Sequence, residues 1–402
     1  MIKHNYYDIE LSINPKKQSI KVDTKLTYYC NEENINRLNF YIHKDLIIHN
    51  INCNNLVKYR VEEDIANWNP FISESKKVTI YFNKSLFKRD KIDIKFNYSG
   101  QIRGLGSSGV NRITEKWIEL GVYAPWFPLV ESFDKAYFKV KILFEEGNYA
   151  VVGSNITKKV DKGWIIEQKV PFIDCSFLAS EYFIENQYSS QIKQVYIKVY
   201  YINQEHKTIA KKLSEQSIFI FKTFTNKFGE ISHQDYSIVI LPREDGGGYN
   251  RPGLIVLPNL KVNQALTHYK YLSGEIGNFK YLAHEISHLW WSKADINTWE
   301  DWLNESFAEY SSLIAIRKYY GEKEFKDIID KYIENSKELP PIKGIDRGHK
   351  NVFDTLYIKG CILLHELEKE IGEEKFEKLL NEMHINKINN TEKLLDKLLH
   401  LK

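Results

Sequence analysis

Cysteine is rare in this chain, and the few cysteines form no recognisable pattern. The four among 402 residues, Cys30, Cys53, Cys175 and Cys361, lie far apart and have no C-x-x-C spacing. This spacing indicates neither a cysteine zinc site nor a disulfide framework. Thiols that stay reduced are typical of the cytoplasm, and we expect a cytoplasmic location.

Long apolar runs, strong net charge and repeated segments are also missing. The N-terminal residues MIKHNYYDIELSIN do not resemble a signal peptide, and no later stretch reaches membrane-spanning length. The net charge is +3, and lysines are interspersed with acids, so no nucleic-acid surface is expected. With only 20 glycines and 10 prolines, no low-complexity segment is visible.

What is present is the composition of a folded globular protein. Hydrophobic residues make up 43% of the chain and charged residues 27%, which is ordinary for such proteins. A length of 402 residues exceeds one typical domain, so two domains are expected.

The N-terminal half has the period of β-strands. Apolar residues alternate with polar ones at Ile9, Leu11 and Ile13, and again in several later segments up to about residue 188. Alternation of this kind predicts antiparallel strands with one buried face, as in a β-sandwich or saddle.

The pattern changes after a polar stretch. Residues Glu185 to Ser190 read as a break between domains, and helical periods dominate from His206 onward. We therefore predict a β domain at 1–188 and a second domain at 189–402.

A metal-binding motif lies in the second domain. His284 and His288 are four residues apart on a segment with helical apolar spacing, so both imidazoles face one side and can reach one ion. Glu285 between them can act as a general base on a water held by that ion. Two helix histidines with ordinary polar roles are the alternative interpretation.

A second helix supplies further carboxylates. Thr298 and Asp301 resemble a capping box that opens this helix, and Glu305 falls in its early part. Two histidines and Glu305 would complete a catalytic zinc site with one open position. Glu309, one turn on, suits a hydrogen bond to the far nitrogen of a ligand histidine, although a solvated surface acid is equally compatible with the spacing.

These motifs resemble those of the aminopeptidase N and leukotriene-hydrolase family of zinc metallopeptidases, which belong to the gluzincins. HEISHLWW followed by WLNESFAEY is similar to the zinc signature of that family, with sixteen residues instead of eighteen between His288 and Glu305. The resemblance implies an α+β multidomain protein in which the N-terminal antiparallel β-sandwich or saddle domain precedes a thermolysin-like α/β zinc metallopeptidase domain. It also implies one Zn²⁺ and a short form that lacks the family's C-terminal helical domain.

The resemblance extends to substrate-binding and catalytic positions. Tyr357 in the segment YIKG corresponds to the family's tyrosine that stabilises the transition state, although core packing is the plain alternative. Residues Gly246, Gly247, Gly248, Tyr249 and Asn250 occupy the place of the family's peptide-binding G-A-M-E-N motif. Asn250 replaces its amine-binding Glu, and Arg251 lies beside it. Glu119 matches an acidic position that helps bind the substrate amine in some members, with a solvent-facing strand residue as the alternative.

The expected function follows from the zinc site and from this resemblance. We expect a zinc-dependent metallopeptidase that hydrolyses peptide bonds through a zinc-activated water, most nearly an aminopeptidase. Because Asn250 replaces the carboxylate, an endopeptidase or a dedicated peptide-processing protease is the alternative, and a non-catalytic peptide-binding protein is a third. The expected partner is a peptide substrate, with neither nucleic acid nor membrane, and a protein partner could cover the active site.

Overall fold

The computed structural model describes residues 3–62, 73–103, 109–154, 156–189, 196–231, 235–244, 247–260 and 274–401. The chain divides into two compact units. The first contains residues 1–184, 245–247 and 251–254, and the second contains residues 185–244, 248–250 and 255–402. A division into domains at 1–188 and 189–402 stays our proposal.

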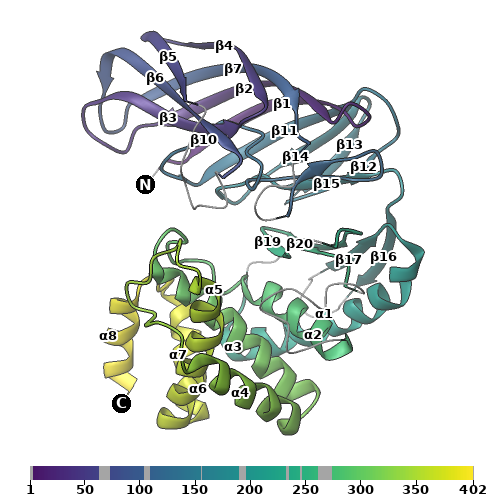
Figure 1. Cartoon of the computed structure of the whole chain (residues 1–402), viewed down its shortest axis with the longest axis vertical. Coiled ribbons are helices and arrows are strands. Elements are labelled where there is room, and N and C mark those ends of the chain that lie inside the picture. The colour runs from purple at the N-terminus through teal and green to yellow at the C-terminus, as the bar shows by residue number, and fades with distance from the viewer. Residues whose placement is uncertain are drawn as a thin grey trace. The chain divides into compact units, whose positions relative to one another are not determined.

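A seven-stranded sheet forms the largest layer of the first unit (Figure 1). Its order is β13 (Ile156–Val160), β14 (Gly163–Glu167), β11 (Ala136–Phe144), β1 (Asn5–Asn14), β2 (Ser19–Tyr29), β7 (Lys91–Gln101) and β4 (Leu46–Cys53). Neighbouring strands are antiparallel except β1 and β11, which pair in parallel. The sheet is therefore mixed, and at this one pairing the expectation of purely antiparallel strands was wrong. Alternation along one strand does not determine the direction of its neighbour.

Two four-stranded sheets are also present among the described residues of this unit. One has the order β10 (Leu129–Val130), β3 (Ile35–His43), β6 (Ser75–Leu86) and β5 (Leu56–Glu62). The other has the order β12 (Ala150–Gly153), β15 (Phe177–Ser180), β9 (Ile118–Leu120) and β8 (Arg112–Ile113).

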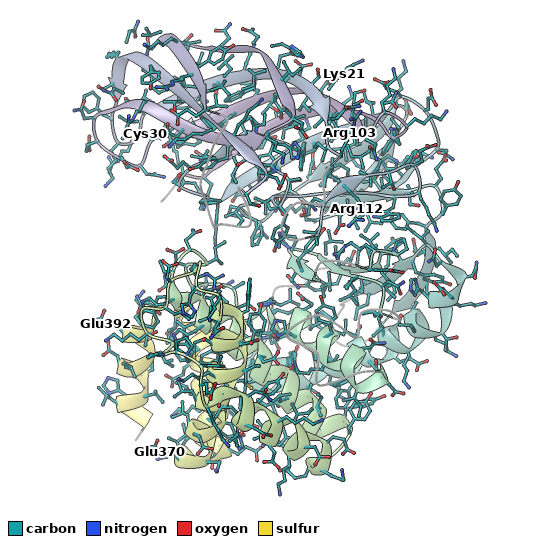
Figure 2. The ribbon with its side chains drawn as sticks, in the orientation of Figure 1. Lys21, Cys30, Arg103, Arg112, Glu370 and Glu392 are labelled. Carbon is teal, nitrogen blue, oxygen red and sulfur yellow. The ribbon has the colours of Figure 1, made fainter. Side chains whose placement is uncertain are left out.

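The alternating apolar residues build the core of this unit, as predicted. Ile9, Leu11 and Ile13 of β1 are fully buried, while Lys21 of β2, labelled in Figure 2, is exposed. Phe127 packs edge-on against Phe138 with ring centroids 5.1 Å apart. Burying one such aromatic side chain stabilises the fold by about 1.5–3 kcal/mol. Many apolar side chains are buried in this way, so apolar packing holds the first unit together.

A five-stranded sheet opens the second half of the fold. Its order is β16 (Ile184–Ser189), β17 (Tyr196–Tyr201), β18 (Tyr236–Ile240), β20 (Leu254–Leu257) and β19 (Tyr249–Arg251). β17 and β18 are parallel. The polar stretch expected to be a break thus forms strand β16. An edge strand tolerates polar residues because it has only one neighbour, and Glu185 of β16 pairs with Lys198 of β17 at 3.2 Å.

Helices dominate the rest of the second unit. They are η1 (Gln204–His206), α1 (Lys207–Phe228), α2 (Gly274–Ser287), η2 (Trp299–Asp301), α3 (Trp302–Tyr319), α4 (Glu322–Ser336), α5 (Val352–Asp354), η3 (Thr355–Lys359), α6 (Gly360–Ile371), α7 (Glu373–Ile385) and α8 (Thr391–Leu401). α3 is buried along most of its length and packs against α2, α4, α6 and η3. A helix buried on all sides is a rigid platform for side chains placed on it. Within the described ranges, none of the helices combines the length and hydropathy that crossing a bilayer requires.

Candidate active site

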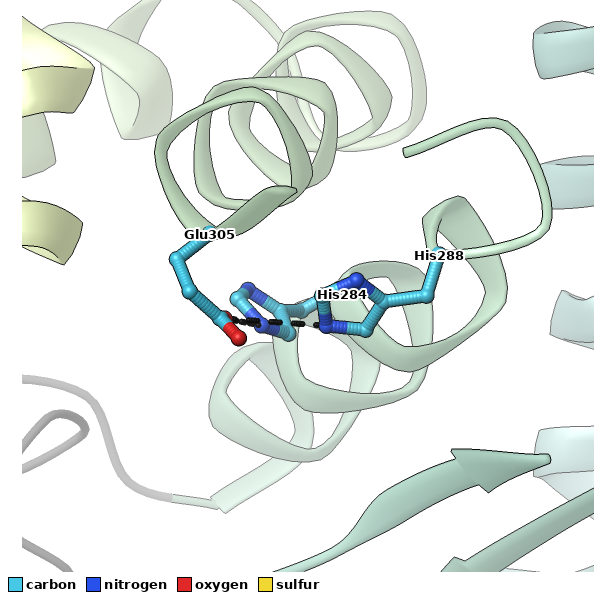
Figure 3. Close-up of side chains that lie close together, drawn as sticks. All are labelled: His284, His288 and Glu305. Carbon is cyan, nitrogen blue, oxygen red and sulfur yellow. Dashed lines mark ion pairs between the residues drawn. The ribbon is translucent and has the colours of Figure 1, made fainter. Parts of the chain in front are cut away.

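Three side chains from two neighbouring helices converge on one point (Figure 3). His284 lies in the last turn of α2, His288 follows the end of that helix, and Glu305 lies in the first turn of α3. One ligand atom from each lies within 4.8 Å of the other two. The Oε2 atom of Glu305 is 3.4 Å from Nε2 of His284 and 3.7 Å from Nε2 of His288. The helical spacing read from the sequence thus becomes a compact set of donor atoms.

The loop between the two helices is fixed by the residue that precedes Glu305. The Asn304 side chain accepts a hydrogen bond from the Ala294 amide at 3.1 Å and donates one to the Ala294 carbonyl at 3.2 Å. It also donates to Asp301 at 2.8 Å, and Asp301 pairs with Arg347 at 2.9 Å. These bonds hold the short connection against the start of α3. Sixteen residues therefore suffice to bring Glu305 to the histidines.

The donor set fits a divalent metal ion. The Oε2 atom of Glu305 is inaccessible to solvent and has no hydrogen-bond partner, and leaving such an atom unpaired is costly unless something else binds it. Two imidazole nitrogens and one carboxylate oxygen, with a fourth position left open, form the ligand set typical of catalytic zinc.

The electrostatics of the cluster also favour a bound cation. Burial by itself lowers the pKa of His284, but the carboxylates of Glu305 and Glu309 raise it to about 9. Burial raises the pKa of Glu305, whereas His288 and His284 lower it to about 2. The carboxylates thus create a negative potential at the imidazoles, which a metal ion would neutralise in place of protons.

The second nitrogen of each histidine has its own partner. Nδ1 of His284 lies 2.9 Å from Oε2 of Glu309, and Nδ1 of His288 lies 3.0 Å from the Trp291 carbonyl. Glu309 is fully buried, so it is not a solvated surface acid. Acceptors at Nδ1 fix the protons there and leave both Nε2 atoms for a metal.

Glu285 lies on α2 between the two histidines and is 5% exposed. Its backbone carbonyl accepts a hydrogen bond from the Asn250 side chain at 2.9 Å. The negative charge of Glu285 also raises the pKa of His284, although it contributes less than burial, Glu305 and Glu309 do. Glu285 therefore lies within electrostatic reach of the donor set.

Tyr357 lies in η3, a π-helical turn, and its ring stacks on His284 with centroids 5.3 Å apart. Burial, followed by the charge of Glu305, raises the pKa of Tyr357 well above its ordinary value. The phenol therefore keeps its proton and can donate a hydrogen bond. Single π turns within helices are frequent at functional sites.

Gly360 has a steric reason to be glycine. A Cβ added there would lie 1.8 Å from Oγ of Ser306 on α3. Ser306 in turn donates a hydrogen bond to the Leu356 carbonyl at 2.5 Å. This close approach holds the turn that carries Tyr357 against the helix that carries Glu305.

The glycine segment leads into β19, the last strand of its sheet. Gly246 lies outside the described residues, whereas Gly247 and Gly248 immediately precede β19. The Gly248 amide donates to the Tyr281 hydroxyl, and a Cβ at Gly248 would lie 2.8 Å from the Val256 carbonyl. In the part of the chain that the structure describes, β19 lies at the end of its sheet beside β20.

Two residues discussed for amine binding belong to the first unit. Glu119 lies in β9 and is fully buried, not solvent-facing, and the Asn111 amide donates to it at 3.4 Å. Arg251 donates to buried Asp174 at 2.6 Å and lies over the Tyr123 ring at 5.5 Å. Asp174, which neutralises the guanidinium beside Asn250, was not predicted from the sequence. No motif surrounds Asp174 that could have indicated this pairing.

Lys280 and Tyr332 were also missed. Lys280 is fully buried and its ammonium pairs with Glu309, which also accepts a hydrogen bond from Tyr332 at 2.5 Å. A weak signal for Lys280 was present, because this lysine lies on the apolar face of the predicted helix, between Ile276 and Ala283. A cation on a buried face requires a partner.

Comparisons with known proteins agree with the geometry. Residues 213–401 match the Peptidase family M1 domain. The chain is 25% identical to human endoplasmic reticulum aminopeptidase 2 over 279 residues, which are 62% of this chain and 28% of that protein. It is 33% identical to aminopeptidase N of Lactococcus lactis over 114 residues, which are 24% of this chain and 13% of that protein. The chain spans less than a third of the length of these curated relatives.

Solved structures share the fold over the whole chain. An M1 zinc metallopeptidase from Deinococcus radiodurans is similar with a TM-score of 0.69 and 16% identity, over 99% of this chain and 91% of that one. Yeast LTA4 hydrolase in complex with bestatin is similar with a TM-score of 0.72 and 17% identity, over 98% of this chain and 64% of that one. Residues 213–401 thus resemble an M1 peptidase domain, and the whole chain shares the fold of the M1 zinc metallopeptidase from Deinococcus radiodurans.

Proposed function

We propose that this protein is a zinc-dependent metallopeptidase that hydrolyses peptide bonds. The observation that carries the proposal is the convergence of His284, His288 and Glu305, whose ligand atoms lie within 4.8 Å of one another. Bound zinc would lower the pKa of a coordinated water toward about 7 and polarise the scissile carbonyl. The fit of the donor set, the buried unpaired oxygen of Glu305 and the names of the relatives all support zinc as the metal.

The residues around the metal ligands have separate roles in this proposal. Glu285 accepts a proton from the attacking water and delivers it to the leaving amine. Tyr357 donates its hydroxyl hydrogen to the developing oxyanion, which its raised pKa permits. Glu309 holds His284 through Nδ1.

The peptide substrate would extend the five-stranded sheet. Among the described residues β19 is the end strand of that sheet, and a Cβ at Gly248 before it would lie 2.8 Å from the Val256 carbonyl, so the chain passes close to β20 there. A peptide added as a strand would bond to the main chain near Gly247, Gly248 and Tyr249.

We propose aminopeptidase-like specificity, with endopeptidase activity as the alternative. Several curated relatives are aminopeptidases. Asn250 offers no negative charge to a substrate ammonium, and its side-chain amide already donates to the Glu285 carbonyl. Because Asp174 neutralises Arg251, however, that guanidinium repels an ammonium less than an unpaired one would. Glu119 remains the proposed acid for the amine.

Two measurements test the proposal. The purified protein should contain about one zinc per chain, and it should hydrolyse peptides with a free N-terminus faster than N-acetylated ones. Preference for acetylated or internal sites would favour the endopeptidase.

A variant tests the general base. Glu285→Gln should bind zinc but lose nearly all turnover, and full activity of this variant would refute the general-base role. Zinc and peptide binding without any turnover in the wild type would favour the non-catalytic alternative. A cytoplasmic location and a protein partner over the active site stay predictions.

A further inference from the structure

A buried lysine lies directly behind the proposed metal site. Lys280 is on α2, about one turn before His284, and its side chain is fully buried. Its ammonium pairs with Glu309 of α3, whose side chain is 1% exposed. Lysine is almost never buried without a specific partner, because its charge loses the stabilisation of water. This position therefore calls for an explanation beyond general stability.

The two oxygens of Glu309 have different tasks. Oε1 accepts hydrogen bonds from the Lys280 ammonium and from the Tyr332 hydroxyl of α4 at 2.5 Å. Oε2 faces Nδ1 of His284 at 2.9 Å. Two donors on one oxygen fix the plane and the direction of the carboxylate, so the other oxygen is held at the ring of the ligand histidine.

We infer that Lys280 and Tyr332 are positioning residues for the metal ligand His284. They act through Glu309, whose fixed carboxylate holds the proton on Nδ1 and aims Nε2 at the ion. Both groups come from helices that pack around α3, so the arrangement is rigid. This inference rests on the proposed zinc function, and it adds residues that touch neither metal nor substrate. Partners of this kind typically change metal affinity by about 10- to 100-fold when removed.

The simpler interpretation is an ion pair that only links helices α2 and α3. The chain offers a matched control for that interpretation. Arg317 of α3 pairs with Glu368 of α6 at 2.8 Å, and Glu368 is largely buried. Arg317 lies about three turns along α3 from Glu305, so losing this pair weakens the fold without disturbing the metal ligands.

The test measures zinc affinity instead of activity. Metal-free protein of each variant is titrated with zinc in competition with a chromophoric chelator, and the melting temperature is recorded separately. Lys280→Met should bind zinc about 10- to 100-fold more weakly than the wild type. Tyr332→Phe, which keeps the ring and loses one donor, should weaken zinc binding several-fold. Arg317→Met should melt at a lower temperature and keep the wild-type zinc affinity.

The outcomes separate this inference from the proposed function. Failure of the wild-type protein to bind zinc would refute the proposed function itself. Tight zinc binding by the wild type with unchanged affinity in both Lys280→Met and Tyr332→Phe would overturn the positioning role. If Lys280→Met does not fold, the zinc affinity of Tyr332→Phe alone tests the positioning role. An Arg317→Met variant that loses as much zinc affinity as Lys280→Met would show that general loosening, not positioning, governs the metal.

Discussion

The phenol ring of Tyr357 stacks on the imidazole of His284, with centroids 5.3 Å apart and ring planes 8° apart. The contact depends on the π-helical turn Thr355–Lys359, because a π turn rotates its residues relative to a regular helix. It places the tyrosine beside a metal ligand while the raised pKa keeps its proton in place. The structure thus joins two segments more than seventy residues apart in the sequence.

Tyr357→Phe should separate the role of the hydroxyl group from the role of the ring. The ring can keep its stacking on His284, so zinc affinity should not change, but the oxyanion loses one donor. We expect kcat to fall about a hundredfold with little change in KM. Steady-state kinetics on a peptide with a free N-terminus, together with zinc titration, measures both. Tyr319→Phe, at a half-exposed tyrosine of α3, is the control, and an unchanged kcat in Tyr357→Phe would remove the tyrosine from the mechanism.

Gly360→Ala should destabilise the fold. The added Cβ would lie 1.8 Å from Oγ and 2.7 Å from Cβ of Ser306, so the turn or α3 must shift. Overpacking of this kind costs about 1–3 kcal/mol, which urea unfolding can measure. The double variant Ser306→Ala with Gly360→Ala removes the nearer atom and should recover part of the loss. Equal stability of Gly360→Ala and the wild type would contradict the close approach.

Asp174→Asn should leave a buried cation without its partner. Arg251 is 8% exposed and donates to Asp174 at 2.6 Å. Breaking a buried ion pair from one side costs about 3–5 kcal/mol, again measurable by urea unfolding. Removing both charges with Asp174→Asn and Arg251→Gln should restore most of the stability. Glu10→Gln, which breaks the exposed pair with Lys141, should change it by less than about 1 kcal/mol.

Glu131 should contribute a pH-dependent part of the stability. Burial raises its pKa, but hydrogen bonds from Lys77 and Asn39 and the charge of Lys77 lower it below the ordinary value. A carboxyl with a lowered pKa stabilises the fold above its unfolded pKa, and this contribution is lost as the pH falls through the folded pKa. We therefore expect the free energy of unfolding to drop as the pH falls below about 4.3, and to drop less in Glu131→Gln.

An exposed carboxyl provides the comparison for Glu131. Glu146 pairs with Lys16, but its side chain is 57% exposed, so screening by water leaves the pair little influence on stability. Glu146→Gln should follow the wild-type pH dependence when urea unfolding is repeated between about pH 5 and pH 3. If the free energy of unfolding falls as steeply with pH in Glu131→Gln as in the wild type, the bonds of Glu131 with Lys77 and Asn39 do not cause the pH dependence.

Much of the fold was readable from local patterns. Strict alternation at Ile9, Leu11 and Ile13 predicted a strand with one buried face, and these side chains are fully buried. The polar stretch from Glu185 also forms strand β16, which its residues did not indicate because an edge strand has no strong apolar signal. The parallel pairing of β1 with β11 could not be predicted from the sequence, because the two strands are more than a hundred residues apart.

The sequence by itself determined the positions whose geometry is local. Histidines four apart on a helix must share a face, so His284 and His288 could be paired without any structure. The partners of those ligands required the tertiary fold. Lys280 meets Glu309, Tyr357 meets His284 and Arg251 meets Asp174 only because separate segments pack together. Helical periodicity determines which face a residue occupies, whereas packing between distant elements decides what that face touches.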